Sequence, residues 1–96
     1  MEKPMRLMLR FTIPVEKGNE AEADGSLSAA IKELVEKVQP EAAYFHLQDG
    51  KRAGTIFFEE SSQARMAVIN EPLFAKLNAA IDIQPAVSLE ELTDKL

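Results

Sequence analysis

The strongest constraint on the fold is a strict alternation of side chains between Met5 and Pro14. Every second residue is a large apolar one, in the series Leu7, Leu9, Phe11 and Ile13. The residues between them are Arg6, Met8, Arg10 and Thr12. A period of two residues is that of a β-strand, whose successive side chains point to opposite faces. The segment is therefore predicted to be a strand with one face in the core and a second face of mixed character.

A second constraint is the Asp49-Gly50 pair between two further apolar runs. This dipeptide favours a two-residue hairpin turn, in which both positions need a positive φ. If these two residues form the whole turn, Gln48 faces Lys51 and the core side carries Ala43, Phe45, Leu47, Gly54, Ile56 and Phe58. A slip of one residue would turn one strand over and bring Phe57 beneath the helices. The sequence leaves this register open.

A helix is predicted between the first strand and the hairpin. Its apolar residues recur at helical spacing, in the series Leu27, Ala30, Ile31, Leu34, Val35 and Val38. The residues from Pro14 to Asn19 are interpreted as a turn, because Asn19 and Glu22 fit a capping box. The helix either begins there and runs on, or begins again after Gly25; Pro40 ends it.

A second helix, a last strand and a tail helix follow the hairpin. Ser61 or Ser62 is the candidate N-cap of the second helix, and Pro72 is expected to open a new first turn. Its expected apolar residues are Ala64, Ala67, Val68, Leu73, Phe74 and Leu77. The last strand is predicted over 80–87, with Ile81 and Ile83 inward and Asp82 and Gln84 outward. A capping box at Ser88 and Glu91 predicts a tail helix over 88–96 with the stripe Leu89, Leu92 and Leu96.

The predicted order is β-α-β-β-α-β with a tail helix, which defines the fold class. A split β-α-β arrangement gives an α+β, ferredoxin-like fold, a four-stranded antiparallel sheet with both helices on one face. The length of 96 residues leaves room for one hydrophobic core, so residues 1–96 are expected to form a single domain.

Composition narrows the classes of partner and compartment. The formal net charge of −5 disfavours nucleic-acid binding, which needs a basic surface. The absence of cysteine excludes disulfides and thiolate-ligated metal centres and fits a reducing compartment. No apolar run has the length of a signal peptide or of a membrane span. The expected location is the cytoplasm, with no membrane partner.

The second face of the predicted sheet carries the candidate functional residues. They are Met8, Arg10, Tyr44, His46, Phe57 and Asp82. A face that mixes aromatic and methionine side chains with an arginine, a histidine and a carboxylate is typical of a small-molecule pocket. The same mixture is typical of a subunit interface, which we favour.

Each polar candidate has a functional and a structural interpretation. His46, the only histidine, is either a proton-transfer group or a packed, half-buried strand residue, and the latter is favoured. Arg10 either binds a carboxylate or phosphate of a ligand, or pairs with Asp82 on the neighbouring strand, and again the latter is favoured. Arg6 lies nearer the strand end and is expected to be solvated.

Catalytic and cofactor motifs are absent from the sequence. There is no phosphate-binding glycine loop and no nucleophile elbow. One histidine and no cysteine leave no metal-ligand spacing, so no metal or cofactor is expected. The acidic neighbours Glu59-Glu60 and Glu90-Glu91 are interpreted as solvated ends of elements.

The chain resembles small bacterial proteins of the dimeric α+β-barrel superfamily. The residues that carry the resemblance lie in three segments, at 7–11, 50–58 and 71–79. The resemblance implies that two ferredoxin-like subunits pack sheet face to sheet face, with a cavity between sheet and helices or along the open face. The superfamily includes monooxygenases, haem-degrading enzymes, muconolactone-type isomerases, dehydratases and ligand-binding regulatory domains, among which a fold cannot choose.

Two functions follow as hypotheses. In the first, which we favour, the chain is a homodimer joined through the open sheet face, and it binds a small molecule on that face or near the interface. In the alternative, it is a cofactor-independent monooxygenase, isomerase or lyase that acts on a small aromatic or carbonyl compound. There His46 transfers a proton, Arg10 holds an oxyanion or carboxylate, and Tyr44 orients the substrate.

Overall fold

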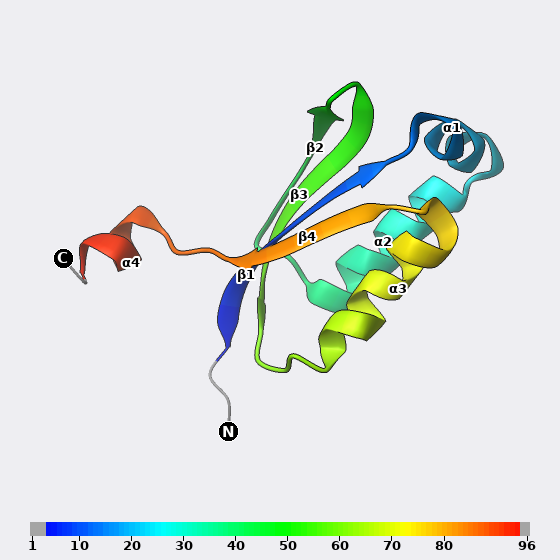
Figure 1. Cartoon of the computed structure of the whole chain (residues 1–96). Coiled ribbons are helices and arrows are strands. Elements are labelled where there is room, and N and C mark those ends of the chain that lie inside the picture. The colour runs from blue at the N-terminus through cyan, green and yellow to red at the C-terminus, as the bar shows by residue number, and fades with distance from the viewer. Residues whose placement is uncertain (1–3, 95–96) are drawn as a thin grey trace.

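The computed structural model describes residues 4–94, which form an α+β fold. Along the chain the elements are β1 (Met5–Ile13), α1 (Val15–Asp24), α2 (Ser26–Val38), β2 (Ala42–Gln48), β3 (Lys51–Glu60), α3 (Arg65–Leu77), β4 (Ala80–Pro85) and α4 (Leu89–Thr93). The four strands make one antiparallel sheet in the order β2-β3-β1-β4. Helices α1, α2 and α3 lie on one side of this sheet (Figure 1), so the arrangement is the predicted ferredoxin-like one.

The core lies between the sheet and the helices. The alternation in β1 is confirmed, because Leu7, Leu9, Phe11 and Ile13 are all buried. Ile56 and Phe58 of β3 extend this apolar layer, and α2 and α3 cover it with Leu34, Ile69, Leu73 and Leu77. The helix side of the sheet is therefore dry over β1 and β3, while the opposite face is left open.

The hairpin has the register that the two-residue turn predicts. Gln48 pairs with Lys51 and His46 pairs with Ala53. Asp49 has a φ of 53° and Gly50 a φ of 76°, as a type I′ turn requires. Phe57 consequently lies on the open face, directly opposite Met8 of β1.

The first helical region is two helices rather than one. Gly25 has a φ of 84°, a left-handed conformation that ends α1 and lets α2 start in a new direction. The predicted turn before Asn19 is wrong, because α1 already begins at Val15 behind Pro14, whose φ of −54° suits a helix start. Asn19 does not cap a helix; its side-chain oxygen accepts a hydrogen bond from Arg52.

The second helical region is one continuous helix. Pro72 lies inside α3 and opens no new turn. The N-cap residue of α3 is Ala64 and no side chain that the structure describes caps the helix, so the prediction that Ser61 or Ser62 is the cap is wrong. The backbone amides of both serines donate to the carboxylate of Glu60. Ala64, Ala67, Val68 and Phe74 are exposed rather than buried. Leu73 and Leu77 are buried as predicted, and together with Ile69 they define the face toward the sheet at a spacing of four residues.

The tail leaves the body of the domain after β4, which ends at Pro85 (Figure 1). The capping box predicted for α4 is confirmed: the Ser88 hydroxyl accepts from the Glu91 amide, and the Glu91 carboxylate accepts from the Ser88 amide. Leu89 and Leu92 are exposed on this helix. Leu96, the last residue of the predicted stripe, lies outside the described residues.

Candidate functional site

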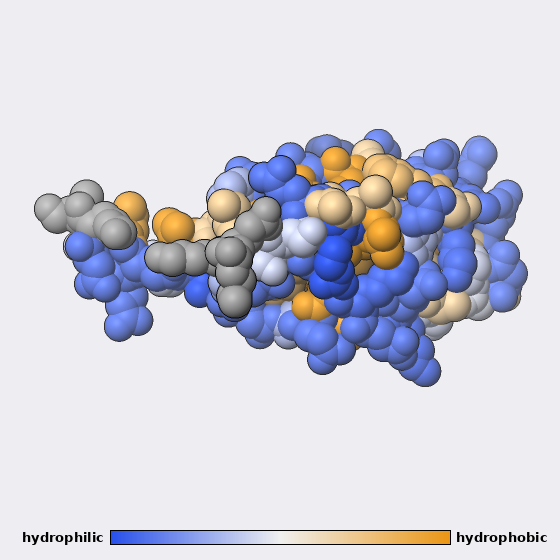
Figure 2. Space-filling model, turned by 90° about the horizontal axis from the view of Figure 1, so that it is seen from below, coloured by the Kyte–Doolittle hydropathy of each residue, from blue (hydrophilic) through white to orange (hydrophobic). Residues whose placement is uncertain are grey.

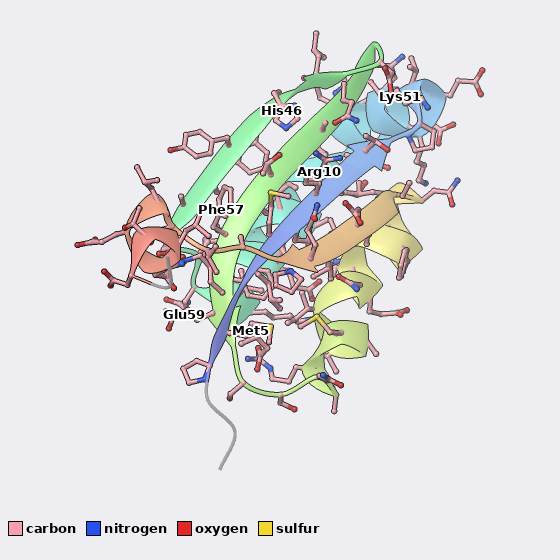
Figure 3. The ribbon with its side chains drawn as sticks, turned by 60° about the vertical axis from the view of Figure 1, so that its left-hand side comes forward. Met5, Arg10, His46, Lys51, Phe57 and Glu59 are labelled. Carbon is pink, nitrogen blue, oxygen red and sulfur yellow. The ribbon has the colours of Figure 1, made fainter. Side chains whose placement is uncertain are left out.

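The open sheet face brings the candidate residues together. Tyr44, Thr55, Arg10 and Asp82 form one row across all four strands. Phe57 and Met8 lie next to each other in the adjoining row, and His46 lies in the row on the other side. Figure 3 shows Arg10, His46 and Phe57 on this face. The alternation predicts that these residues share one face of the sheet, and the structure places them there.

Arg10 sits near the middle of this face with a loose partner. Its Nε lies 3.9 Å from Oδ2 of Asp82, and both side chains are about half exposed. Such a pair contributes little to stability, because water screens it. Within residues 4–94 the Arg10 guanidinium donates no hydrogen bond at standard geometry, so its forked donors are available for another acceptor.

His46 uses both ring nitrogens within its own hairpin. Nδ1 lies 3.1 Å from the carbonyl oxygen of Leu47, and Nε2 lies 2.8 Å from the hydroxyl of Thr55. A carbonyl only accepts, so this geometry assigns the proton to Nδ1 and makes Nε2 the acceptor of the Thr55 hydroxyl. The ring is held in place, but neither nitrogen is left for a substrate.

Apolar side chains lie beside Arg10 in the middle of the open face. Tyr44 is exposed, Phe57 and Met8 are half-buried, and together they form an apolar centre. Strand β3 places Lys51 at one end of the face and Glu59 at the other, as Figure 3 shows. With a rise of about 3.4 Å per residue, the Cα atoms of Lys51 and Glu59 are about 27 Å apart along the strand.

Arg6 is not solvated as predicted but joins the tail to the sheet. Its Nε donates to Glu41 over 2.6 Å, and its Nη1 donates to Glu91 of α4. The hydrogen bond from Arg6, helped by those from Ser88, lowers the pKa of Glu91 to about 2. The same two carboxylates raise the pKa of Arg6. Neither Glu91 nor Glu41 could be assigned to this pair from the sequence, because both lie far from Arg6 along the chain.

Two larger hollows lie on the helix side of the sheet and not on the open face. A groove of about 450 Å³ between α2 and β2 is lined by apolar residues, mainly Phe11, Ile13, Leu27, Ile31 and Phe45. A second hollow of about 510 Å³ lies where β1, β4 and the start of α3 meet, and Met5, Leu7, Met66 and Ile83 line it. Figure 2 shows the molecule from below. Apolar surface lies in the middle of this view, and hydrophilic surface surrounds it.

Two inward charges were missed in the sequence. Arg52 and Glu60 both lie on the helix side of β3, at the same parity as Ile56 and Phe58. Arg52 bonds to Asn19 over 3.0 Å and to Glu22 over 2.5 Å. Glu60, which was interpreted as solvated, has a side chain only 6% exposed, and its Oε1 lies 2.7 Å from Nη1 of Arg65. The parity of β3 identifies both residues only once the two-residue turn is taken as the register of the hairpin.

The comparisons with known proteins assign no family. No family model matches the chain. No curated protein matches it either. Among solved structures, the chain is similar to the de novo designed protein Ferredog-Diesel, with a TM-score of 0.43 and 17% identity over 88% of this chain and 86% of that one.

Two further observations concern metals and membranes. Among residues 4–94, no three side chains of histidine, aspartate or glutamate come together as a metal site would require. In the same part of the chain, every helix is too short or too polar to cross a bilayer.

Proposed function

We propose that this chain acts in the cytoplasm as a homodimer, joined through the open sheet face, that binds a small aromatic carboxylate beside Arg10. The observation that carries the proposal is the layout of that face. Its middle places Phe57, Met8 and Tyr44 beside Arg10, which lacks a close partner, and β3 carries Lys51 at one end and Glu59 at the other.

The charge layout selects one way of packing two copies. A two-fold axis across the strands reverses β3, so Lys51 of one copy meets Glu59 of the other. An axis along the strands would instead bring Lys51 of one copy close to Lys51 of the other, and like charges in contact are unfavourable. The first arrangement is isologous. Because Thr55 lies midway between Lys51 and Glu59, the axis follows the row of Tyr44 and Arg10, and Phe57 of one copy faces Ala53 of the other. The two Arg10 side chains meet on the axis, where a bound carboxylate would offset their repulsion.

The size of the face fits a stable interface. With strands about 4.8 Å apart and a rise of about 3.4 Å per residue, the face is about 20 Å wide and about 30 Å long. Its planar area is then about 600 Å², close to the ~800 Å² of accessible surface per partner in interfaces of standard size. The resemblance to dimeric α+β barrels implies the same contact.

Closing this face would remove water from around Arg10, and that is the reason for proposing a carboxylate ligand. A guanidinium without water needs acceptors, and Asp82 at 3.9 Å supplies only a loose one. A planar carboxylate matches the guanidinium fork, and Tyr44 and Phe57 offer apolar surface for an aromatic ring.

The interface is tested by the mass in solution, measured by light scattering on a sizing column. We expect at least twice the chain mass of 10.6 kDa. Met8→Glu and Phe57→Glu each place a charge in the apolar centre and are expected to lower the mass by half. Phe74→Glu, on the exposed side of α3, is the matched control and leaves the mass unchanged. A monomeric wild type, or a mass that neither face variant changes, contradicts the proposal.

The ligand is tested with benzoate as the probe, followed through backbone amide resonances. We expect shifts at Arg10, Tyr44 and Asp82, and a loss of affinity of at least about tenfold in Arg10→Met. Lys17→Met removes an equal charge from α1, on the opposite side of the sheet, and is expected to leave the affinity within about twofold. Shifts confined to the groove between α2 and β2, or binding that Arg10→Met does not weaken, would assign the ligand elsewhere.

The alternative enzymatic function is the less well supported one. It needs a free nitrogen on His46 to move a proton, and both ring nitrogens are engaged by Leu47 and Thr55. A ligand that breaks the contact with Thr55 would restore this possibility. The same benzoate titration reports on it through the His46 ring resonances.

A further inference from the structure

Strand β2 is exposed on both of its faces. On the open face Tyr44 is 63% exposed, and on the helix side Phe45 is 56% and Leu47 74% exposed. Figure 1 shows the reason: the helices lie over the other strands, and β2 stands beyond them at the edge of the sheet. The apolar groove beside α2 has Phe45 as one of its walls.

The outer edge of β2 also carries unpaired backbone groups. In a two-residue hairpin the closing pair, Gln48 and Lys51, exchanges backbone hydrogen bonds, and this pattern repeats at every second residue. The amides and carbonyls of Ala43, Phe45 and Leu47 therefore point away from β3. Only the Leu47 carbonyl has a partner within the described residues, the Nδ1 of His46.

This edge lacks the features by which proteins block strand pairing. Residues 42–48 contain no charged side chain and no proline, and the register with β3 is continuous without a bulge. The other edge, β4, differs, since it carries Asp82 and ends with Pro85. Of the two edges, β2 is the one that is open to another strand.

We propose that β2 pairs antiparallel with β2 of a second copy of this chain, about a two-fold axis at Phe45. In this register the three outward-pointing residues pair among themselves: Phe45 faces Phe45, and Ala43 faces Leu47 in both directions. On the other side of the strands Tyr44 faces His46. Every pair is neutral, the small residue faces the large one, and an aromatic pair lies at the centre, all of which favour cross-strand pairing.

The alternative registers are poorer. A shift of the partner strand by two residues brings either Glu41 or the turn residue Asp49 into the ladder and leaves one outward residue without a partner. A shift by one residue places the outward-pointing amides and carbonyls of one strand opposite residues of the partner strand whose amides and carbonyls point toward their own β3. No ladder of hydrogen bonds forms in that register. The self-complementarity of the neutral register is the argument for a second copy rather than an unrelated extended peptide.

The buried area is sufficient for a specific contact. Aromatic side chains bury 150–250 Å² each, so covering the exposed parts of Tyr44, Phe45 and Leu47 removes roughly 400 Å² per copy. Strand pairing also brings the two copies of α2 to either side of the seam, where Leu27 and Ile31 of each groove gain cover. The total over both copies reaches the ~1,000 Å² of a specific interface.

This contact is separate from the one under Proposed function. Of the residues named for the two contacts, the edge of β2 and the open face share only Tyr44, so a chain that uses both forms assemblies of about four times 10.6 kDa. A chain that uses only the edge forms dimers that Met8→Glu and Phe57→Glu do not dissociate. Failure of one contact is therefore distinguishable from failure of the other.

The pairing is tested first by amide hydrogen exchange on the wild-type chain. Amides of Tyr44 and His46 bond to β3 in any case. Those of Ala43, Phe45 and Leu47 are protected only if a second strand is present. We expect all three to exchange at least about tenfold more slowly than unpaired amides at concentrations where light scattering shows association. Fast exchange at all three under those conditions overturns the proposal.

The register is tested by cross-linking, for which a chain without cysteine is suited. Phe45→Cys places two thiols on directly opposed residues, about 5.5 Å apart between Cα atoms, within the range of a disulfide. In Leu47→Cys the two thiols are offset along the strands by about 14 Å and are out of reach. We expect a covalent dimer from Phe45→Cys under mild oxidation and none from Leu47→Cys. Equal cross-linking of the two, or none from Phe45→Cys, contradicts the pairing, because face-to-face packing leaves both thiols on the outside.

Discussion

The ring of Phe11 rests on the backbone of Gly54, which lies directly opposite it on β3. A Cβ atom at Gly54 would come within 2.5 Å of Cε2 of Phe11. The same ring meets Phe45 edge to face, with centroids 6.5 Å apart and planes at 79°. The missing side chain at Gly54 therefore determines where Phe11 lies, and Phe11 in turn forms part of the groove beside β2.

We expect Gly54→Ala to destabilise the domain by about 1–3 kcal/mol, because the added methyl forces the Phe11 ring out of a packed position. Urea unfolding measures the effect. Phe11→Leu should relieve the clash, so the double variant is expected to lose less than the sum of the two single losses. Simple additivity of the two variants would show that the contact does not limit the substitution.

Glu60 and Glu59 form a matched pair for testing the buried charge. Glu60 accepts from Arg65 and from the amides of Ser61 and Ser62, whereas Glu59 is exposed on the other face. We expect Glu60→Gln to cost about 1–3 kcal/mol, because a charged acceptor is lost at the start of α3. Glu59→Gln should change the free energy of unfolding by less than about 0.5 kcal/mol. If urea unfolding gave equal losses of unfolding free energy for the two variants, the Glu60 carboxylate would be solvated rather than buried.

His46 gives a test of its own contacts. Long-range proton–nitrogen NMR is expected to show the proton on Nδ1, since the Leu47 carbonyl needs a donor. His46→Ala should change the free energy of unfolding by less than about 1 kcal/mol, because its hydrogen bonds are exposed to water. A loss above about 2 kcal/mol, or a proton on Nε2, would mean that the ring is held by other contacts.

The sequence predicts most of the fold because two local signals agree. Alternation in β1 defines the buried face, and Asp49-Gly50 favours the hairpin register that the structure has, whereas the sequence alone also allowed a slip of one residue. The neighbours of His46 within the hairpin follow from that register. Element boundaries were less predictable. Asn19 is of a residue type that often caps helices, but its side-chain oxygen accepts a hydrogen bond from Arg52. No local sequence pattern encodes this contact.

The exposure of side chains was the least predictable property. Phe45 has the parity of a core residue, and only the lateral position of the helices leaves it in water. The tie between Arg6 and Glu91 likewise depends on where the tail runs after β4. Both are tertiary effects, and both decide which surfaces a partner can reach.

The contact between Arg6 and Glu91 predicts a dependence of tail docking on pH. The pKa of Glu91 is lowered to about 2 from the ordinary value of 4.5, mainly by the hydrogen bond from Arg6. Because folding lowers the pKa of this carboxylate, its contribution to tail docking is complete at every pH above the pKa of the unfolded chain. The contribution is lost as the pH falls through the lower pKa of the folded chain. Between about pH 4.5 and about pH 2, Glu91 should therefore stay ionised while solvated carboxylates become protonated.

A carbon-13 NMR titration of the Glu91 carboxyl group measures this midpoint directly. Arg6→Gln is expected to raise it toward 4.5, leaving only the lowering due to Ser88. Arg10→Gln removes the same charge from the neighbouring part of β1 and should leave the midpoint unchanged, because Arg10 pairs with Asp82. A wild-type midpoint near 4.5 would show that the tail is not held by Arg6 in solution, and α4 would then be free to move independently of the sheet.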